Sequence, residues 1–368
     1  MLSTTPSLPH TTPSASSSSQ GCPESTVKPD ANGWVPPGTC GYISRPYYPS
    51  FIAALVFSTA AAAVLAGYMY MILRVARRRP RLLDQSTPLW KHRLLLPTFG
   101  ALISTCLLIA YVLRALGTRH QQVLEFVAFS DTLVLMCPIL TFALDCILLL
   151  RMMTANLLDE KLVGVKVHGI SRCLFIVVPL LAAEQFIASI LIAPKHRPSP
   201  SRRSTSTALL GLKLYIIGIG IQGVIVVGTI LLALVLNRRN RDREPEVYEV
   251  KSRESSDECR LLPTWHSASF ALLFSLAAIA TRITYRVVEL SGIFTGYLPV
   301  LIHKEVFFYT FECLPVLAAV GVWTCVDGDF LGDWSSISAA VGSHGYHEIS
   351  GELADDDSVV LGPVNLGT

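Results

Sequence analysis

The residues best placed to do chemistry are charged and phenolic side chains inside two otherwise apolar segments. One set has the i, i+3, i+4, i+7 spacing of a single α-helix face: Arg282, Tyr285, Arg286 and Glu289. The next segment repeats this kind of spacing with Glu305, Tyr309 and Glu312. A charge at mid-bilayer costs roughly 2.5–3.5 kcal/mol, so such faces are expected to meet each other or water. The natural partner of either arginine is Glu305 or Glu312, as a structural clamp, a substrate contact or both.

Other polar residues interrupt apolar segments earlier in the chain. Acidic residues in such positions are functional candidates by default, and they comprise Asp131, Asp145 and Glu184. Gln222 follows Gly218 and Gly220, and small residues allow helices to approach closely enough for an amide to bond across the interface. Close helix packing is therefore the first interpretation of Gln222.

The elements that must position these residues are membrane-spanning helices. A helix needs about 20 mostly apolar residues to cross ~30 Å of hydrocarbon. Hydrophobic residues make up 51% of the chain and charged residues only 15%, against about 25% charged in soluble domains. We therefore predict an all-α, polytopic membrane protein, a bundle of seven transmembrane helices. The predicted spans are residues 50–73, 94–113, 123–150, 173–193, 208–236, 266–290 and 306–326.

The flanking regions differ in composition from the spans. Residues 1–45 are rich in Ser, Thr and Pro and predict a disordered tail, whereas residues 327–368 form an acidic tail around a membrane domain of residues 46–326. Most basic loop residues follow the first, third and fifth spans, which predicts an extracellular N-terminus and a cytoplasmic C-terminus. Cys22 and Cys40 would then lie outside, either disulfide-bonded or as two free thiols.

The string from Arg282 onward, R-x-x-Y-R-x-x-E-x-x-G-x-x-x-G followed by E-x-x-x-Y-x-x-E, resembles the signature of the fungal RTA1-like proteins, the lipid-translocating exporter family. Further positions agree over about residues 40 to 330: Cys40, Tyr48-Pro49-Ser50, Tyr111, Arg114, Pro138, Gly218 and Gln222. Several positions depart from the family, among them those of the fourth and seventh spans. Glu312 stands where Asp is usual, and Pro179, Glu184 and Gln185 occupy a region that normally carries Asp and Gln followed by glycines.

The resemblance implies seven spans, an outside N-terminus and relatives linked to resistance against sterol-like toxic compounds and to release or flipping of sphingoid long-chain bases. The leading hypothesis is therefore a lipid or amphiphile translocator at the plasma membrane. A carboxylate such as Glu289, Glu305 or Glu312 would attract the ammonium group of the substrate. The alternative is a seven-helix receptor or sensor, which the same topology fits equally well.

Several function classes fit poorly. A net charge of +3 does not indicate nucleic acid binding, and the nine His are too scattered for a metal-dependent lipid hydrolase. The sequence has no Gly-rich phosphate loop of the Walker type. We expect no enzyme activity, no metal and no cofactor. The expected partners are membrane lipids and an amphiphilic small molecule, and protein partners stay open.

Overall fold

The computed structural model describes residues 30–32, 34–35, 49–78, 89–121, 123–156, 161–162, 165–192, 202–251, 261–295 and 304–326. Most of the two predicted tails lies outside the described residues, and so do Cys22 and Cys40. The described part is helical apart from one antiparallel hairpin of two-residue strands, β1 (Lys161–Leu162) and β2 (Val165–Lys166).

Six long helices precede a seventh, segmented one. They are α1 (Phe51–Arg78), α2 (Leu89–Arg119), α3 (Leu124–Asn156), α4 (Val167–Ile192), α5 (Arg202–Lys251) and α6 (Leu261–Thr295). The seventh span consists of α8 (Glu305–Phe308), a π-helix η3 (Tyr309–Cys313), α9 (Leu314–Gly321) and a 3₁₀-helix η4 (Val322–Cys325). Within the described residues, seven helices are long and apolar enough to cross a membrane, which confirms the predicted fold class.

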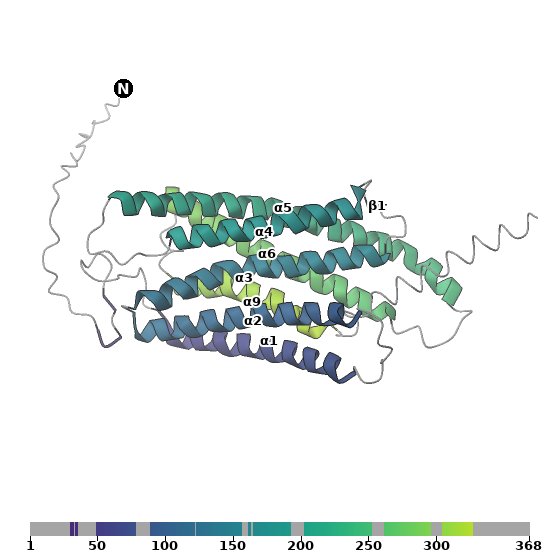
Figure 1. Cartoon of the computed structure of the whole chain (residues 1–368), viewed down its shortest axis with the longest axis horizontal. Helices are drawn as coiled ribbons and strands as arrows, with labels where there is room; N and C mark the ends of the chain where they lie inside the picture. The colour runs from purple at the N-terminus through teal and green to yellow at the C-terminus, as the bar shows by residue number, and fades with distance from the viewer. Residues whose placement is uncertain are drawn as a thin grey trace, which may run out of the picture.

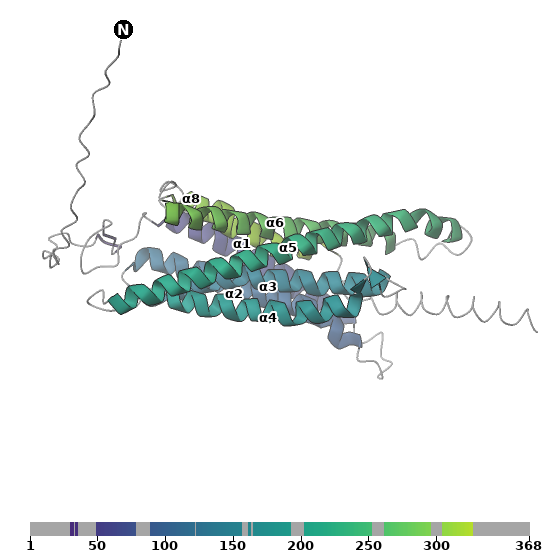
Figure 2. The same ribbon diagram turned by 90° about the horizontal axis from the view of Figure 1, so that it is seen from above.

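The helices lie side by side in one elongated bundle (Figures 1 and 2). Each helix from α1 to α6 packs against the next one in sequence, and α9 packs against both α6 and α1. The seventh span thereby closes the ring of helices. Helix α3 also contacts α5, α6 and α9, and 61% of the most apolar stretch of its span is buried. The interior of the bundle is therefore built around α3 and the seventh span.

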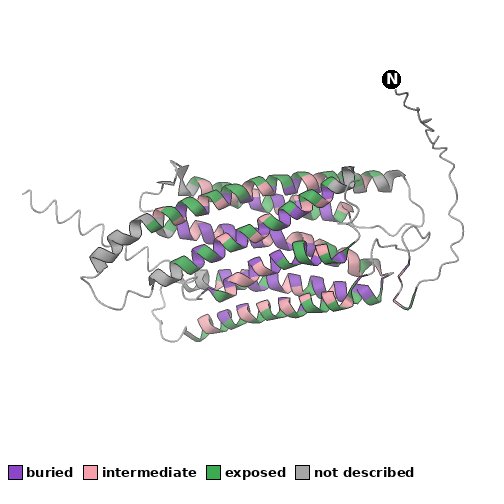
Figure 3. Cartoon of the chain, turned by 180° about the vertical axis from the view of Figure 1, so that it is seen from behind, coloured by how far each residue is buried: buried purple, intermediate pink, exposed green. Residues whose placement is uncertain are grey.

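The outer surface of the bundle is apolar. Buried residues face the neighbouring helices, whereas exposed residues follow the outside of each helix (Figure 3). Large hydrophobic side chains on that outer face include Ile52, Phe175, Val224, Phe270 and Val306. An apolar exterior over a partly polar interior is the arrangement expected for helices in lipid, where association depends on close packing and polar contacts between helices.

Helix α5 is longer than the predicted span of residues 208–236. It contains 50 residues and is therefore about 75 Å long, more than twice the thickness of the hydrocarbon core. The predicted loop after this span thus begins as helix, which continues to Lys251. Arg and Glu are good helix formers, which favours a helix that continues beyond the end of the apolar residues.

The seventh span changes its winding in the middle. In η3 the backbone N–H of Leu314 bonds to the carbonyl of Tyr309, five residues earlier. The next residue, Pro315, has no N–H to donate, and a proline ring clashes with the carbonyl four residues before it in a regular α-helix. The wider π turn accommodates this proline and leaves Tyr309, Glu312 and Cys313 buried together.

Close packing at Gly100 supplies a test of the fold. The Tyr68 ring lies where a β-carbon at position 100 would be, and its hydroxyl donates to the carbonyl of Val320 over 2.8 Å. We expect Gly100→Ala to destabilise the bundle by about 1–3 kcal/mol, because a buried ring has to move. Thermal unfolding of the full chain in detergent measures this effect.

The matched control is Gly228→Ala, since a β-carbon at position 228 meets nothing within 4 Å. This substitution is expected to leave the melting temperature unchanged or to raise it slightly. Equal losses for the two variants would contradict the packing described here.

Candidate functional site

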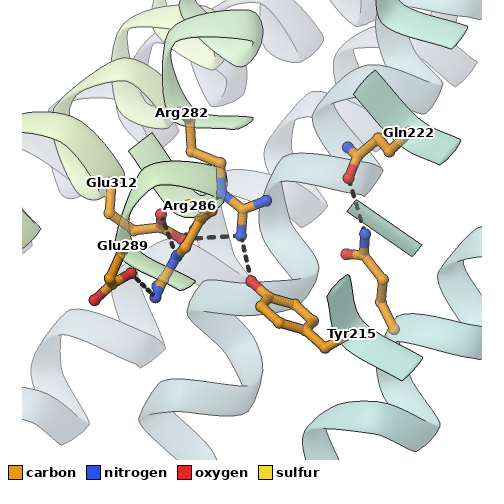
Figure 4. A network of polar contacts seen from close by, with 7 residues as sticks. Tyr215, Gln222, Arg282, Arg286, Glu289 and Glu312 are labelled. Carbon is orange, nitrogen blue, oxygen red and sulfur yellow. Dashed lines mark hydrogen bonds and ion pairs between the residues drawn. The ribbon is translucent and has the colours of Figure 1, made fainter. Parts of the chain in front are cut away.

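Five side chains from three helices form a buried network that we call the central ion-pair network: Tyr215, Arg282, Arg286, Glu289 and Glu312 (Figure 4). Arg282 binds Glu312 Oε1 through Nε at 3.0 Å and Nη2 at 2.9 Å. Arg286 donates from Nε to Glu312 Oε2 over 2.7 Å, so Glu312 bridges both guanidinium groups. The network joins α6 to the seventh span.

The other two members of the network, Glu289 and Tyr215, each bind one of the arginines. Arg286 Nη1 donates to Glu289 Oε2 over 2.7 Å, within α6. Arg282 Nη2 donates to the Tyr215 hydroxyl over 3.1 Å, which ties in α5. Two arginines and two glutamates give no net charge. Both Arg282 and Glu312 have no exposed surface, and charges so deeply buried require this degree of pairing.

Local structure explains why these side chains converge. Arg282 and Arg286 are four residues apart, so they lie about one turn apart on the same face of α6. Glu312 belongs to the π turn η3, whose buried side faces α6. Tyr285, directly before Arg286 on α6, is buried as well, and its ring stacks on Phe311 with centroids 5.7 Å apart.

A second cluster surrounds Arg114 near the C-terminal end of α2. Its Nη1 lies 3.2 Å from Asp131 Oδ1, and its Nη2 lies 3.9 Å from Glu305 Oε1. The guanidinium carbon is 3.9 Å from the centroid of the Phe308 ring, within cation–π range. Glu305 also accepts the backbone N–H of Ser50 over 2.5 Å, directly before α1 begins. This cluster therefore fastens the starts of the first and seventh spans to α2 and α3.

Asp145 in α3 forms a third polar contact. The Ser275 hydroxyl of α6 donates to Oδ2 over 2.7 Å, and the Trp323 indole of η4 donates to Oδ1 over 3.0 Å. Asp145 has no exposed surface. Its two oxygens thus have hydrogen-bond donors from two other helices.

The fourth polar group lies between α4 and α5. Gln185 Nε2 donates to Gln222 Oε1 over 2.8 Å, and both side chains are fully buried (Figure 4 labels Gln222). The carboxyl group of Glu184 rests against Gly218, one turn before Gln222 on α5. Neither Glu184 oxygen has a hydrogen-bond partner among the described residues.

The structure brings together some of the predicted site residues and separates others. Arg282 and Arg286 pair with Glu312, whereas Glu305 lies with Arg114 and does not join the central ion-pair network. Tyr309 is buried and stacks on Phe57 with ring centroids 5.0 Å apart. The three carboxylates expected to attract a substrate ammonium, Glu289, Glu305 and Glu312, all have an arginine partner.

Several residues of these sites are absent from the predicted set. They are Arg114, Gln185, Tyr215, Ser275 and Trp323. Arg114 lies one residue beyond the predicted span of residues 94–113, yet α2 continues to Arg119 and Arg114 is only 7% exposed. A basic residue followed by apolar Ala115 and Leu116 is the signal that marks it as helical. Ser and Trp in an apolar helix give no such signal.

Comparisons with known proteins relate the chain to one protein family. A family model described as RTA1 like protein matches residues 98–331. The chain is similar to the "Probable lipid transporter atnI" of Emericella nidulans, with 23% identity over 296 residues that cover 80% of this chain and 70% of the relative. No solved structure matches the chain.

The charge balance of the central ion-pair network predicts a compensation effect. Glu312→Gln leaves the network with one uncompensated positive charge and is expected to cost about 3–5 kcal/mol of stability. Adding Arg282→Met restores neutrality, because Arg286 keeps its bond to Glu289. The double variant is therefore expected to be more stable than Glu312→Gln alone, as measured by unfolding in detergent.

Glu289→Gln is the matched single variant, since Glu289 is 18% exposed and binds one arginine only. We expect it to destabilise the protein less than Glu312→Gln does. A double variant no more stable than Glu312→Gln would show that charge pairing is not the main contribution of this network.

Proposed function

Because the chain belongs to the RTA1-like protein family, as a multi-pass membrane protein, we propose that it moves amphiphilic lipids across its membrane. Sphingoid long-chain bases and sterol-like toxic compounds are the proposed substrates, and tolerance to them is the proposed benefit to the cell. The similar protein from Emericella nidulans is named as a probable lipid transporter, and this name supports lipid as the substrate class.

The observation that carries this proposal is the spacing of polar sites along the seventh span. Glu305, Glu312 and Trp323 each belong to a different polar cluster. At about 1.5 Å per residue, the distance from the first to the last is about 27 Å, close to the ~30 Å thickness of the hydrocarbon core. A lipid head group passing along this span would meet hydrogen-bonding groups at successive depths, while its apolar tail stays in the bilayer.

The proposed location is the plasma membrane, with the N-terminus outside and the C-terminus in the cytoplasm. The basic residues concentrated after the first, third and fifth spans support this orientation, because loops rich in Lys and Arg stay in the cytoplasm. In this orientation the Arg114 cluster lies at the outer side of the membrane and Asp145 in the inner half.

Reconstitution tests the proposed function directly. The purified full chain in phospholipid vesicles is expected to accelerate the movement of a labelled long-chain base between leaflets, relative to protein-free vesicles. Labelled phospholipid in the same vesicles measures how selective this movement is. Transfer no faster than in protein-free vesicles would refute the proposal. A ligand-dependent change in binding to an intracellular partner would then favour the receptor alternative.

A cellular experiment tests the role of Glu305. We expect Glu305→Gln to lower tolerance to an added long-chain base severalfold, because the variant keeps an acceptor for Ser50 but loses the charge beside Arg114. Glu125→Gln is the control, since Glu125 is an exposed acid near the start of α3. Surface abundance is measured in parallel, and unchanged tolerance at normal abundance would exclude Glu305 from the route.

A further inference from the structure

Glu184 differs from the other acidic residues inside the spans. Glu289, Glu305 and Glu312 are paired with arginines, and Asp145 accepts two hydrogen bonds. Both carboxyl oxygens of Glu184 are inaccessible, yet neither has a hydrogen-bond partner among the described residues. Glu184 is thus a carboxyl group with buried oxygens for which the described residues supply neither a hydrogen-bond donor nor a counter-charge.

The described residues around Glu184 supply no cation. Helix α4 packs against α3 and α5. On α5, Lys213 is exposed and Tyr215 is bonded to Arg282. The ionisable residues of α3 along this region are Asp131, Cys137, Asp145, Cys146 and Arg151. Asp131 binds Arg114, and Asp145 binds Ser275 and Trp323. Among the described residues, no ionisable group of α3 or α5 forms an ion pair with Glu184. A proton is the simplest species that can neutralise this carboxylate in place.

Two buried amides beside Glu184 have spare hydrogen-bonding capacity. Gln185 and Gln222 use one bond to each other, which leaves Gln185 Oε1 without a donor and Gln222 Nε2 without an acceptor. Gly218 and Gln222 are four residues apart and lie on the same face of α5, and Gln185 adjoins Glu184 in α4. The free acceptor suits the O–H of a neutral carboxylic acid, whereas the free donor suits a carboxylate. The pair can therefore serve both protonation states of Glu184.

The interface between α4 and α5 at Gly218, which we call the seam, leaves space for the Glu184 side chain. Gly218 has no side chain, and the Glu184 carboxyl occupies the space a β-carbon would fill. On either side of the seam the helices expose apolar side chains such as Leu180, Ile187 and Ile221. In these apolar surroundings the carboxyl is most stable when neutral, whereas the amide pair on the same two helices offers a donor for its ionised form.

We propose that Glu184 is a proton-binding site, and that uptake and release of its proton drive the lipid movement proposed above. In each cycle the neutral carboxyl O–H breaks, the proton passes to water, and the carboxylate later takes a proton from water on the other side. The driving force is then a proton gradient. The coupling rests on the proposed function, whereas proton binding at Glu184 does not.

Carbodiimide labelling tests proton binding without any transport. Dicyclohexylcarbodiimide adds to protonated carboxyl groups in apolar surroundings and leaves a stable acylurea that peptide mass spectrometry locates. In the reconstituted full chain, Glu184 is expected to be labelled, and labelling is expected to fall severalfold between about pH 5 and about pH 9 as the carboxyl ionises. Ion-paired Glu312 serves as an internal control that stays unlabelled. An unlabelled Glu184, or labelling independent of pH, would overturn the proposal.

Gly218→Ala supplies a variant that displaces the carboxyl and keeps it in the chain. Since the atom it displaces is the end of a flexible side chain, the protein is expected to fold normally while Glu184 labelling changes at least severalfold. Gly220→Ala, two residues away, is the control, because a β-carbon there meets nothing within 4 Å. Identical labelling in the two variants would place the carboxyl elsewhere and contradict the site.

Vesicles with an imposed pH difference test the coupling. A difference of one pH unit is expected to shift the final distribution of labelled long-chain base by up to about tenfold per proton, after subtraction of protein-free vesicles. Glu184→Gln is expected to abolish this shift but to keep equilibration without a gradient. Equal shifts in wild type and Glu184→Gln would refute coupling through this residue. Absence of any lipid movement, with pH-dependent labelling intact, would instead refute the proposed function and leave the proton site standing.

Discussion

The whole architecture depends on the need to neutralise charge inside hydrocarbon. Glu312 meets this need for two guanidinium groups at once, and Glu289 supplies the second negative charge. This requirement fixes the rotation of α6, since both arginines must face the seventh span. It also fixes the π turn, because that turn holds Glu312 on the buried side before Pro315. Tyr215 then sets the position of α5 against the same arginines.

The need to neutralise buried charge also distinguishes carboxylates that are paired with arginines from carboxylates that can bind a proton or a substrate. A carboxylate held by arginines has its charge balanced within the protein, and binding a substrate cation there would first require breaking that pair. Glu305, Glu289 and Glu312 therefore hold helices together, and a head group that meets them has to compete with an arginine. Glu184 has no such partner among the described residues and lies at a seam lined by apolar surface. Chemical activity is expected where the protein has left a group without internal compensation.

Hydropathy and residue spacing were sufficient to predict the seven spans and to limit the partner of Arg282 and Arg286 to Glu305 or Glu312. Both follow from properties of a single helix: its length, its apolar content and its 3.6-residue period. The partner of Glu305 was not predictable in this way, because it depends on the depth and rotation of α2 relative to the seventh span. The bonds of Asp145 to Ser275 and Trp323 join three helices and have the same origin. The π turn was missed because a regular α-helical spacing was assumed throughout the seventh span.

The contact between Glu305 and Ser50 joins the beginning of the first span to the beginning of the last. Spans are made in order at the ribosome, so α1, and Arg114 of α2, lack this carboxylate until nearly the whole chain has been synthesised. A product that terminates before residue 305 leaves α1 without its anchor and removes the glutamates of the seventh span from three arginines. Such a product therefore keeps guanidinium groups in its membrane domain without the carboxylates that they bind in the complete bundle, at a cost in hydrocarbon that only the last span removes.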